Sequence, residues 1–205
     1  MHNGKADRTR ELESFELRKI NEYLDKVFGF CDLQAKRIAK TSLTNREIAS
    51  DKNLNAGLRL IVKKLHNVAE STDKLKDSEG AFSKKKGQIY KVLGSLADIG
   101  ADLNEVVNRH SSGAARAIME KITSEFENSL SDHFKVRKIQ LEKGYNIDYT
   151  QNPEIINLLE TEEEAKDQTI ADILREGYRF RDEILGEKTV KPPVIEAYKY
   201  KKRTA

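Results

Sequence analysis

The longest apolar pattern in the chain constrains its fold more than any other feature. Apolar side chains recur at steps of three and four residues at Ile89, Val92, Leu96, Ile99, Leu103 and Val106, and again at Ile118, Ile122, Phe126, Leu130 and Phe134 toward Ile139. This spacing predicts one face of an α-helix. An unbroken helix over about residues 88–147 is roughly 90 Å long, whereas a small domain is nearer 30 Å across. Such a helix has to lie along partner helices, which favours self-association.

Two further regions carry the same helical spacing. A first helix is expected over about residues 8–48, and a pattern over 53–77 either continues it after a break or forms a second helix. Another helix is expected over about 153–205, with Pro153 near its first turn and an interruption at Pro192 and Pro193. A hydrophobic share of 38% is normal for elongated helices with wet outer faces. We therefore predict an all-α fold, a single domain over residues 8–205 built as an elongated antiparallel three-helix coiled coil.

The charge balance and the single cysteine exclude several classes of protein. The net charge is +3, from 37 basic and 34 acidic residues, so nucleic acid is not an expected partner. Cys31 has no second cysteine to pair with, and no apolar run approaches the roughly 20 residues of a membrane span. The start "MHNGKADRTREL" lacks the apolar segment of a secretory signal. These features predict a cytoplasmic protein.

No pattern in the sequence predicts catalysis. The four histidines, His2, His66, His110 and His133, show no metal-ligand spacing with carboxylates or with the cysteine. Cys31 lies on the apolar stripe of the first helix, which is typical of a core residue, and there is no glycine-rich phosphate loop. We therefore predict a protein that is not an enzyme and holds neither a cofactor nor a metal ion.

The segment from Leu93 to Tyr149 resembles the central helix of the BAR-domain family. The matching positions are Leu93, Gly94, Gly100, His110, the basic run 135–143 and Ile147-Asp148-Tyr149, while Thr150 replaces a second Asp of the family pattern. "NPEIINLLETEEEAKDQ" and "VIEAYKYKKRTA" resemble parts of the third helix of that family. The resemblance implies a homodimer, a crescent-shaped six-helix bundle that binds, senses or shapes curved anionic membranes as a peripheral, non-enzymatic scaffold.

In the BAR-domain family the junction of the second and third helices forms each tip of the crescent. The resemblance therefore implies membrane contacts by the basic residues of that junction, Lys135, Arg137, Lys138 and Lys143. Each basic residue contributes about 1 kcal/mol at an anionic surface, and dimerisation doubles their number. A second candidate contact is the run Lys84, Lys85 and Lys86. The alternatives are a solvated helix face for the first group and a flexible polar loop for the second.

A second resemblance predicts a different function. "TIADILREGYRFRDEIL", residues 169–185, is similar to a segment of GrpE-type nucleotide exchange factors, Thr-Val-Val-x-Val-Leu-x-x-Gly-Tyr-x-Leu-x-Asp-x-Val-Leu. These factors pair a long helical dimer with a small β-domain that opens an Hsp70 chaperone. The Arg-Pro-Ala that follows in that family is Gly186-Glu187-Lys188 here. This alternative implies a β-hairpin with Gly177, Tyr178 and Asp182.

The helical spacing predicts instead that residues 169–185 form a helix, in which Gly177 costs up to about 1 kcal/mol. The two functions therefore differ in the secondary structure that they require in this segment. A generic helical scaffold for protein partners is the third function that the sequence leaves open.

Overall fold

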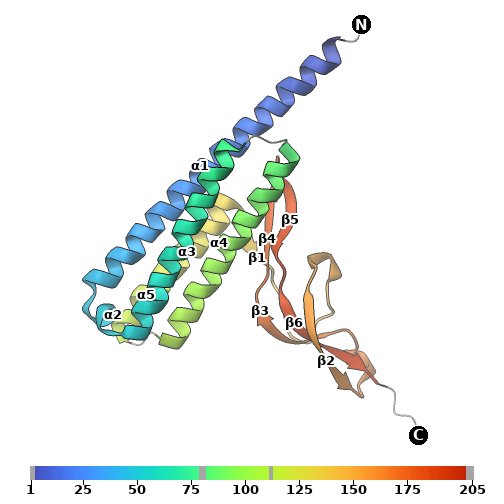
Figure 1. The fold of residues 1–205 in the computed structure, drawn as a ribbon. Coiled ribbons are helices and arrows are strands. Elements are labelled where there is room, and N and C mark those ends of the chain that lie inside the picture. The colour runs from blue at the N-terminus through green and yellow to red at the C-terminus, as the bar shows by residue number, and fades with distance from the viewer. Residues whose placement is uncertain (1–2, 79–81, 111–112, 202–205) are drawn as a thin grey trace.

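The first part of the chain forms helices and the part after them forms strands (Figure 1). The expected all-α coiled coil is therefore wrong. The computed structural model describes residues 3–78, 82–110 and 113–201, with the side chains of 3–13 and 110 excepted. Within these ranges the helices are α1 (Asn3–Thr44), α2 (Arg46–Ser50), α3 (Lys52–Asp77), α4 (Phe82–His110) and α5 (Gly113–Phe134). The strands are β1 (Val136–Lys138), β2 (Glu154–Thr161), β3 (Ile170–Arg175), β4 (Tyr178–Asp182), β5 (Gly186–Lys191) and β6 (Val194–Tyr200).

The first helical region ends where the sequence supplies two helix-capping residues. Asn45 follows α1, and its side chain accepts a hydrogen bond from the backbone N–H of Ile48 at 3.1 Å, which caps α2. Asp51 caps α3 by accepting from the N–H groups of Asn53 and Leu54 at 2.9 and 3.0 Å. These caps satisfy backbone donors that have no partner inside a helix. The pattern over 53–77 is therefore a separate helix that turns back along α1.

The expected helix over 88–147 is two helices that pack against each other. Gly100 of α4 lies beside Phe126 and Leu130 of α5, so the two helices form an antiparallel pair. α5 then ends at Phe134, because Lys135 takes the left-handed conformation (φ 56°) that commonly follows a helix C-terminus. The apolar stripes that predicted self-association are thus covered within one protomer.

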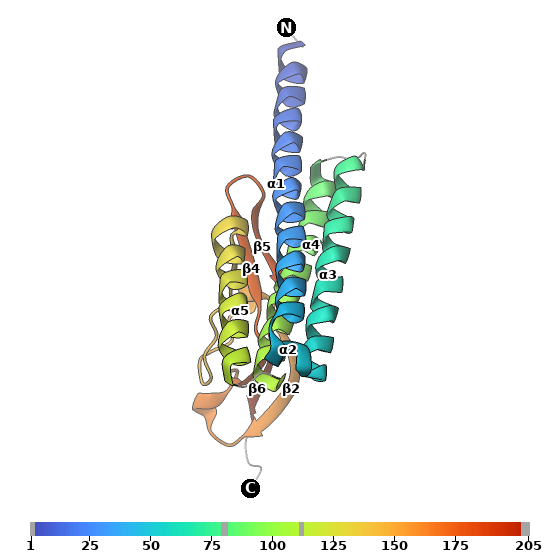
Figure 2. The same ribbon diagram turned by 90° about the vertical axis from the view of Figure 1, so that its left-hand side faces the viewer.

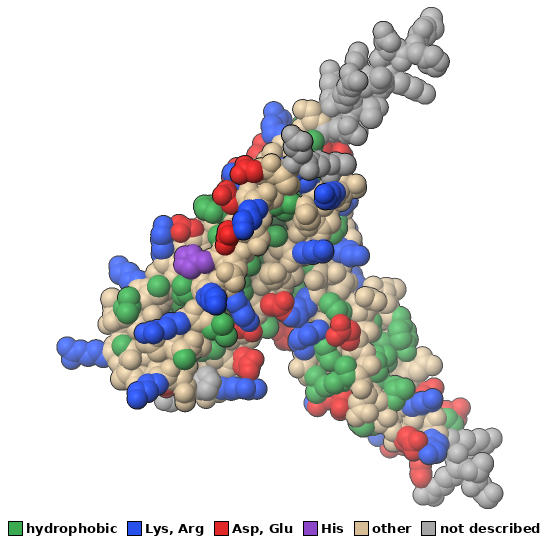
Figure 3. All heavy atoms as spheres, viewed as in Figure 1, with side chains coloured by type: hydrophobic (Ala, Val, Ile, Leu, Met, Phe, Trp, Pro, Cys, Tyr) green, Lys and Arg blue, Asp and Glu red, His purple; other side chains and the backbone are tan. Residues whose placement is uncertain are grey.

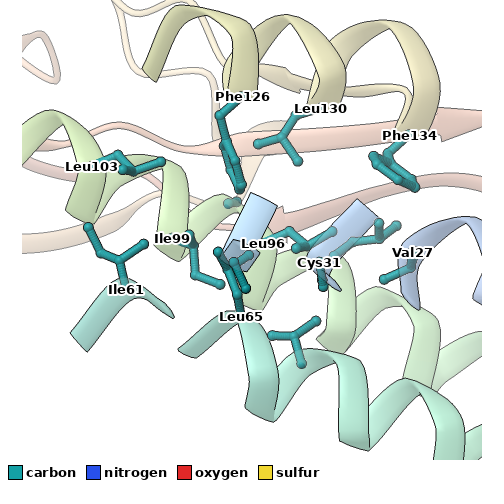
Figure 4. Close-up of a cluster of buried hydrophobic side chains, with 14 of the residues drawn as sticks. Val27, Cys31, Ile61, Leu65, Leu96, Ile99, Leu103, Phe126, Leu130 and Phe134 are labelled. Carbon is teal, nitrogen blue, oxygen red and sulfur yellow. The ribbon is translucent and has the colours of Figure 1, made fainter. Parts of the chain in front are cut away.

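Helices α1, α3, α4 and α5 share one hydrophobic core. Figure 4 shows buried side chains from all four helices converging, among them Cys31, Leu65, Leu96 and Phe126. Cys31 is fully buried, as expected of a core residue, and burial raises the pKa of its thiol to about 12. None of the helices, within the residues described, is long and apolar enough to cross a membrane.

The expected helix over 153–205 is wrong, because this region forms the strands β2 to β6, which together with β1 make two three-stranded sheets. The inner sheet has the strand order β1-β4-β5, all antiparallel, and the outer sheet has the order β2-β6-β3 with β2 parallel to β6. In β4 the buried Tyr178 and Phe180 alternate with Arg179 and Arg181. This period of two is typical of a strand with one buried face, and it is too short to stand out against the helical spacing nearby.

The two sheets differ in what they pack against. Val136, Tyr178, Phe180 and Leu185 of the inner sheet region join the core of the helices. The outer sheet has a small core of its own, formed by Ile147, Ile170, Ile195 and Ala197. Figure 1 shows the outer sheet on an arm that projects away from the helices.

Gly94 allows α4 to approach the inner sheet closely. A Cβ at this position would lie 2.7 Å from the backbone oxygen of Val190 in β5, which is shorter than any tolerable contact. Gly87, earlier in the same helix, has open space around it. Close packing against β5 therefore explains the glycine at this position, which resembled a glycine of the BAR-family pattern.

The substitutions Gly94→Ala and Gly87→Ala are expected to change stability in opposite directions. At Gly87 the alanine improves helix propensity and should stabilise the fold by about 0.5 to 1 kcal/mol. At Gly94 the clash with the backbone of β5 should outweigh that gain and destabilise by about 1 to 3 kcal/mol. Urea unfolding of both variants measures the difference. Equal effects at the two sites would contradict the close packing of α4 on β5.

Candidate protein-docking surfaces

Residues 169–185 form strands and a turn, so the expected helix over this segment is wrong. Tyr178 and Asp182 stand at the two ends of β4, and Gly177 directly precedes it. The register Asp182↔Gly186 closes a hairpin between β4 and β5. The Asp182 carboxylate accepts hydrogen bonds from the backbone N–H groups of Ile184 and Leu185, both at 2.9 Å, which fixes the turn.

Gly177 lies where the chain crosses between the two sheets. The chain passes from the outer to the inner sheet at 176–177 and returns at 192–193, and the two crossings touch. A Cβ on Gly177 would lie 2.5 Å from Cδ of Pro193 and 3.0 Å from Cδ1 of Ile139. The carbonyl of Gly177 also accepts a hydrogen bond from the N–H of Ile139 at 2.8 Å. Only glycine fits this position without moving its neighbours.

An apolar hollow of about 430 Å³ opens on the outer sheet. We call it the outer-sheet hollow. Its apolar and aromatic lining is Ile147, Tyr149, Ile155, Leu158, Ala197, Tyr198 and Tyr200, and the polar residues Asp167, Gln168 and Lys199 complete it. Leu158 is 52% exposed and Tyr149 58%. Figure 3 shows hydrophobic side chains gathered over the projecting arm.

Two properties make the outer sheet suited to binding another protein. Exposed apolar side chains that gather in one place mark interaction sites, because water disfavours them. In addition, β2 is an edge strand of this sheet, so one row of its backbone groups is not paired within the sheet. The outer-sheet hollow is therefore our first candidate docking surface.

Three of the residues expected to contact a membrane lie together, though not at the tip of a helical bundle. Lys135 follows α5 and donates to the backbone oxygen of Asp132 at 2.8 Å, while Arg137 and Lys138 belong to β1. Lys138 forms ion pairs with Glu127 at 2.9 Å and Glu176 at 2.8 Å. Partial burial opposes the charged form of Lys138, but these two hydrogen bonds outweigh it and raise its pKa.

The remaining basic residues expected at a membrane do not line the hollow that these three line. Lys143 forms an ion pair with Asp172 of the outer sheet at 2.7 Å. Lys84, Lys85 and Lys86 belong to α4, so the alternative of a flexible loop is wrong for them. Lys85 is buried and donates to the backbone oxygen of Lys76 at 3.2 Å, whereas Lys84 is exposed. Lys86 lies over the ring of Phe82, 5.8 Å from its centroid.

Sequence reasoning missed the residues that complete the basic cluster. Arg179 and Arg181 of β4 line the same hollow as Lys135, Arg137 and Lys138. The alternation Tyr178-Arg179-Phe180-Arg181 is the signal that would have found them, since it puts both arginines on the face opposite the core.

Metal binding has no support among the described side chains, where no three of the types His, Cys, Asp and Glu gather at one place. Of the histidines examined in the sequence, His2 and the side chain of His110 lie outside the described residues.

The hydrogen bonds that Asp182 accepts in the β4–β5 turn are expected to stabilise the fold. Replacing Asp182 by Ala removes the acceptor of two backbone N–H groups and should destabilise the fold by about 1 to 2 kcal/mol. Asp182→Asn keeps an acceptor oxygen and should restore most of this loss. Glu183→Ala, in the same turn, serves as the control and should change stability little. Thermal unfolding compares the three variants, and a Glu183→Ala effect as large as that of Asp182→Ala would contradict the assignment.

Comparison of the chain with family models, with curated proteins and with solved structures found no match in any of the three.

Proposed function

We propose that this chain is a nucleotide exchange factor of the GrpE type that acts on an Hsp70 chaperone. The observation that carries the proposal is the β4–β5 hairpin, with Gly177 directly before it and Tyr178 and Asp182 at the ends of β4. The resemblance of residues 169–185 to exchange factors implies such a hairpin. The membrane-scaffold alternative required a helix over the same segment.

The order of the two parts of the chain supports the same proposal. Exchange factors of this type pair a long helical dimer with a small β-domain that opens the chaperone. Here the long helices come first and the β-strands follow from Val136 onward. In this proposal the outer-sheet hollow docks on the chaperone, because its exposed apolar side chains gain most from leaving water.

The proposed mechanism needs no catalytic group on this chain. A protein that binds the open form of a nucleotide-binding domain more tightly than the closed form shifts the population toward the open form. Nucleotide then dissociates faster, and by reciprocity nucleotide weakens binding of the exchange factor. The apolar contacts of the outer sheet would supply the binding free energy, at about 1.5 to 3 kcal/mol for each large side chain that becomes fully buried.

A homodimer through α1 is part of the proposal. Figures 1 and 2 show the first part of α1 extending well beyond the other helices. Phe15 belongs to the first half of α1 and is 44% exposed. A helix gains most of its stability from packing along an apolar face, so a second copy of α1 is the natural partner. The dimer is therefore proposed from the projecting part of α1. The earlier ground, an unbroken helix over residues 88–147, does not apply.

The other functions that the sequence left open keep less support. Membrane association was inferred from a crescent-shaped all-α bundle, and that fold is wrong. A generic helical scaffold for protein partners does not require the β4–β5 hairpin that residues 169–185 begin. A cytoplasmic location belongs to the proposal, as the site of an exchange factor for a cytoplasmic chaperone.

The direct test is release of a fluorescent ADP analogue from a panel of purified Hsp70 chaperones. Wild-type protein should accelerate release from at least one of them. The variant Tyr149→Ser/Leu158→Ser should lose most of this acceleration at limiting concentration, since about 2 kcal/mol of lost apolar burial weakens binding about 30-fold. Stopped-flow fluorescence measures both rates.

A matched control distinguishes docking from general loss of apolar surface. Leu43→Ser/Leu60→Ser changes two exposed side chains on α1 and α3 and should leave the acceleration intact. Absence of acceleration by the wild type on every chaperone in the panel would refute the proposed function. Equal loss in both double variants would refute the assignment of the outer-sheet hollow.

The dimer has a separate test. Light scattering at micromolar concentration should give about twice the mass of one 23.4 kDa chain. Phe15→Glu should shift the distribution toward the single chain, because a charge at a buried helix pair is costly. Wild-type protein that remains a single chain would rule out pairing through α1.

A further inference from the structure

A second hollow, distinct from the outer-sheet hollow, lies between the last turns of α5 and the β1 edge of the inner sheet, where residues of both sheet faces line it. Its volume is about 740 Å³. The basic residues in its lining are Lys135, Arg137, Lys138, Arg179 and Arg181, and we call this hollow the basic groove. The acidic residues in the lining are Glu127 and Glu187.

Like charges face each other across two neighbouring strands in this groove. Arg137 stands directly opposite Arg179 in the β1–β4 register. The N–H of Arg181 donates to the carbonyl of Lys135 at 3.2 Å, so these two cations are also neighbours. Like charges opposite each other in an antiparallel pair are destabilising. An anionic partner would therefore stabilise the four cations on this face of the sheet.

The carboxylates of the chain leave part of this charge uncompensated. Glu187 forms ion pairs with Arg179 at 3.0 Å and with Arg181 at 3.9 Å, and Asp148 adds its charge near Arg179. Glu127 and Glu176 are both engaged by Lys138. The guanidinium group of Arg137 forms no hydrogen bond or ion pair with any residue that the structure describes.

The floor of the basic groove also carries polar groups without a partner. Tyr178 is 2% exposed, and its hydroxyl has no hydrogen-bond partner among the described residues. The side-chain oxygen of Gln151, which also lines the groove, has none either. Burial raises the pKa of Tyr178 to about 12, so the hydroxyl stays protonated and can donate. Buried polar groups without partners are uncommon in proteins, and each one calls for an explanation such as a bound partner.

We infer that the basic groove binds an extended acidic segment of a protein partner through the carboxylates of that segment. Arg137 and Arg179 pair with carboxylates at the mouth of the groove, and the Tyr178 hydroxyl supplies a donor at its floor. β1 is an edge strand of the inner sheet, so an extended chain can also bond to its free backbone groups. A membrane surface is flat on this scale and does not reach a recessed floor, which favours a polypeptide.

The inference is independent of the exchange function and has its own probe. A fluorescein-labelled peptide of about ten glutamates should bind the full chain at about 0.1 M salt, and a glutamine peptide of equal length should not. Fluorescence anisotropy measures both affinities. Arg137→Gln/Arg179→Gln should weaken binding of the glutamate peptide at least about tenfold.

Matched variants separate the groove from general electrostatic attraction. Arg59→Gln/Arg109→Gln removes the same charge from exposed positions of α3 and α4 outside the groove and should change affinity by less than about twofold. Tyr178→Phe removes a hydroxyl without a partner, so it should keep the fold and weaken peptide binding. Should the double variant Arg137→Gln/Arg179→Gln unfold, the single variant Arg137→Gln replaces it, because this change breaks no side-chain contact in the fold.

Three results would overturn the inference. The first is no binding of the glutamate peptide by the wild type. The second is equal loss of binding in the groove variant and in the Arg59→Gln/Arg109→Gln control, which indicates unspecific attraction. The third is sedimentation with phosphatidylserine vesicles that depends on Arg137 and Arg179 while the peptide does not bind, which would assign the cluster to a membrane surface.

Discussion

The structure depends on the contact between Phe180 and the helices. Phe180 is fully buried, and its ring lies 6.2 Å from that of Tyr23 in α1 and 5.8 Å from that of Tyr90 in α4. Such aromatic pairs contribute beyond their buried area, and both tyrosines also donate hydrogen bonds, Tyr23 to the carbonyl of Phe134 and Tyr90 to that of Leu185. Helices and inner sheet therefore share one core, and this contact holds the inner sheet on the helices.

The outer sheet depends on a second, smaller constraint. It joins the inner sheet through adjacent crossings, where Gly177 and Pro193 touch, and has only its own small core. The link is short and tightly packed, so the outer sheet is held out from the helices as an arm (Figure 1). Its hollow is open for this reason, since no residue of the described α-helices lines it. The same arrangement leaves the basic groove open on the inner sheet.

The sequence predicts the helical regions well because their apolar stripes are long, although it missed the break between α4 and α5 and the end of α5 at Phe134. The stripe through Ile20, Leu24, Val27 and Cys31 is buried as expected, and the capping residues Asn45 and Asp51 mark real breaks. The strands were missed because each is short, and because apolar residues in neighbouring strands fall by chance at helical spacing. The segment 169–185 was the exception, since its likeness to exchange factors implied a hairpin that the periodicity did not.

The candidate surfaces were only partly predictable for a different reason. The cluster of Lys135, Arg137 and Lys138 is local in sequence and was found, but its shape and its partners were not. Arg179 joins Arg137 through a strand register between distant segments, and the outer-sheet hollow brings Tyr149 together with Tyr198. Such pairings depend on tertiary contacts that no local pattern encodes.

The place of β6 in the outer sheet has a consequence for how the chain folds during synthesis. β6 is the central strand, and both β2 and β3 pair with it rather than with each other. The helices precede the strands in the chain, so they can begin to pack before the strands have emerged from the ribosome. β2 and β3, by contrast, wait unpaired until residues 194–200 have emerged. During that interval their edges are open to other nascent chains, so the outer sheet is the part of this protein most dependent on the speed of its own synthesis.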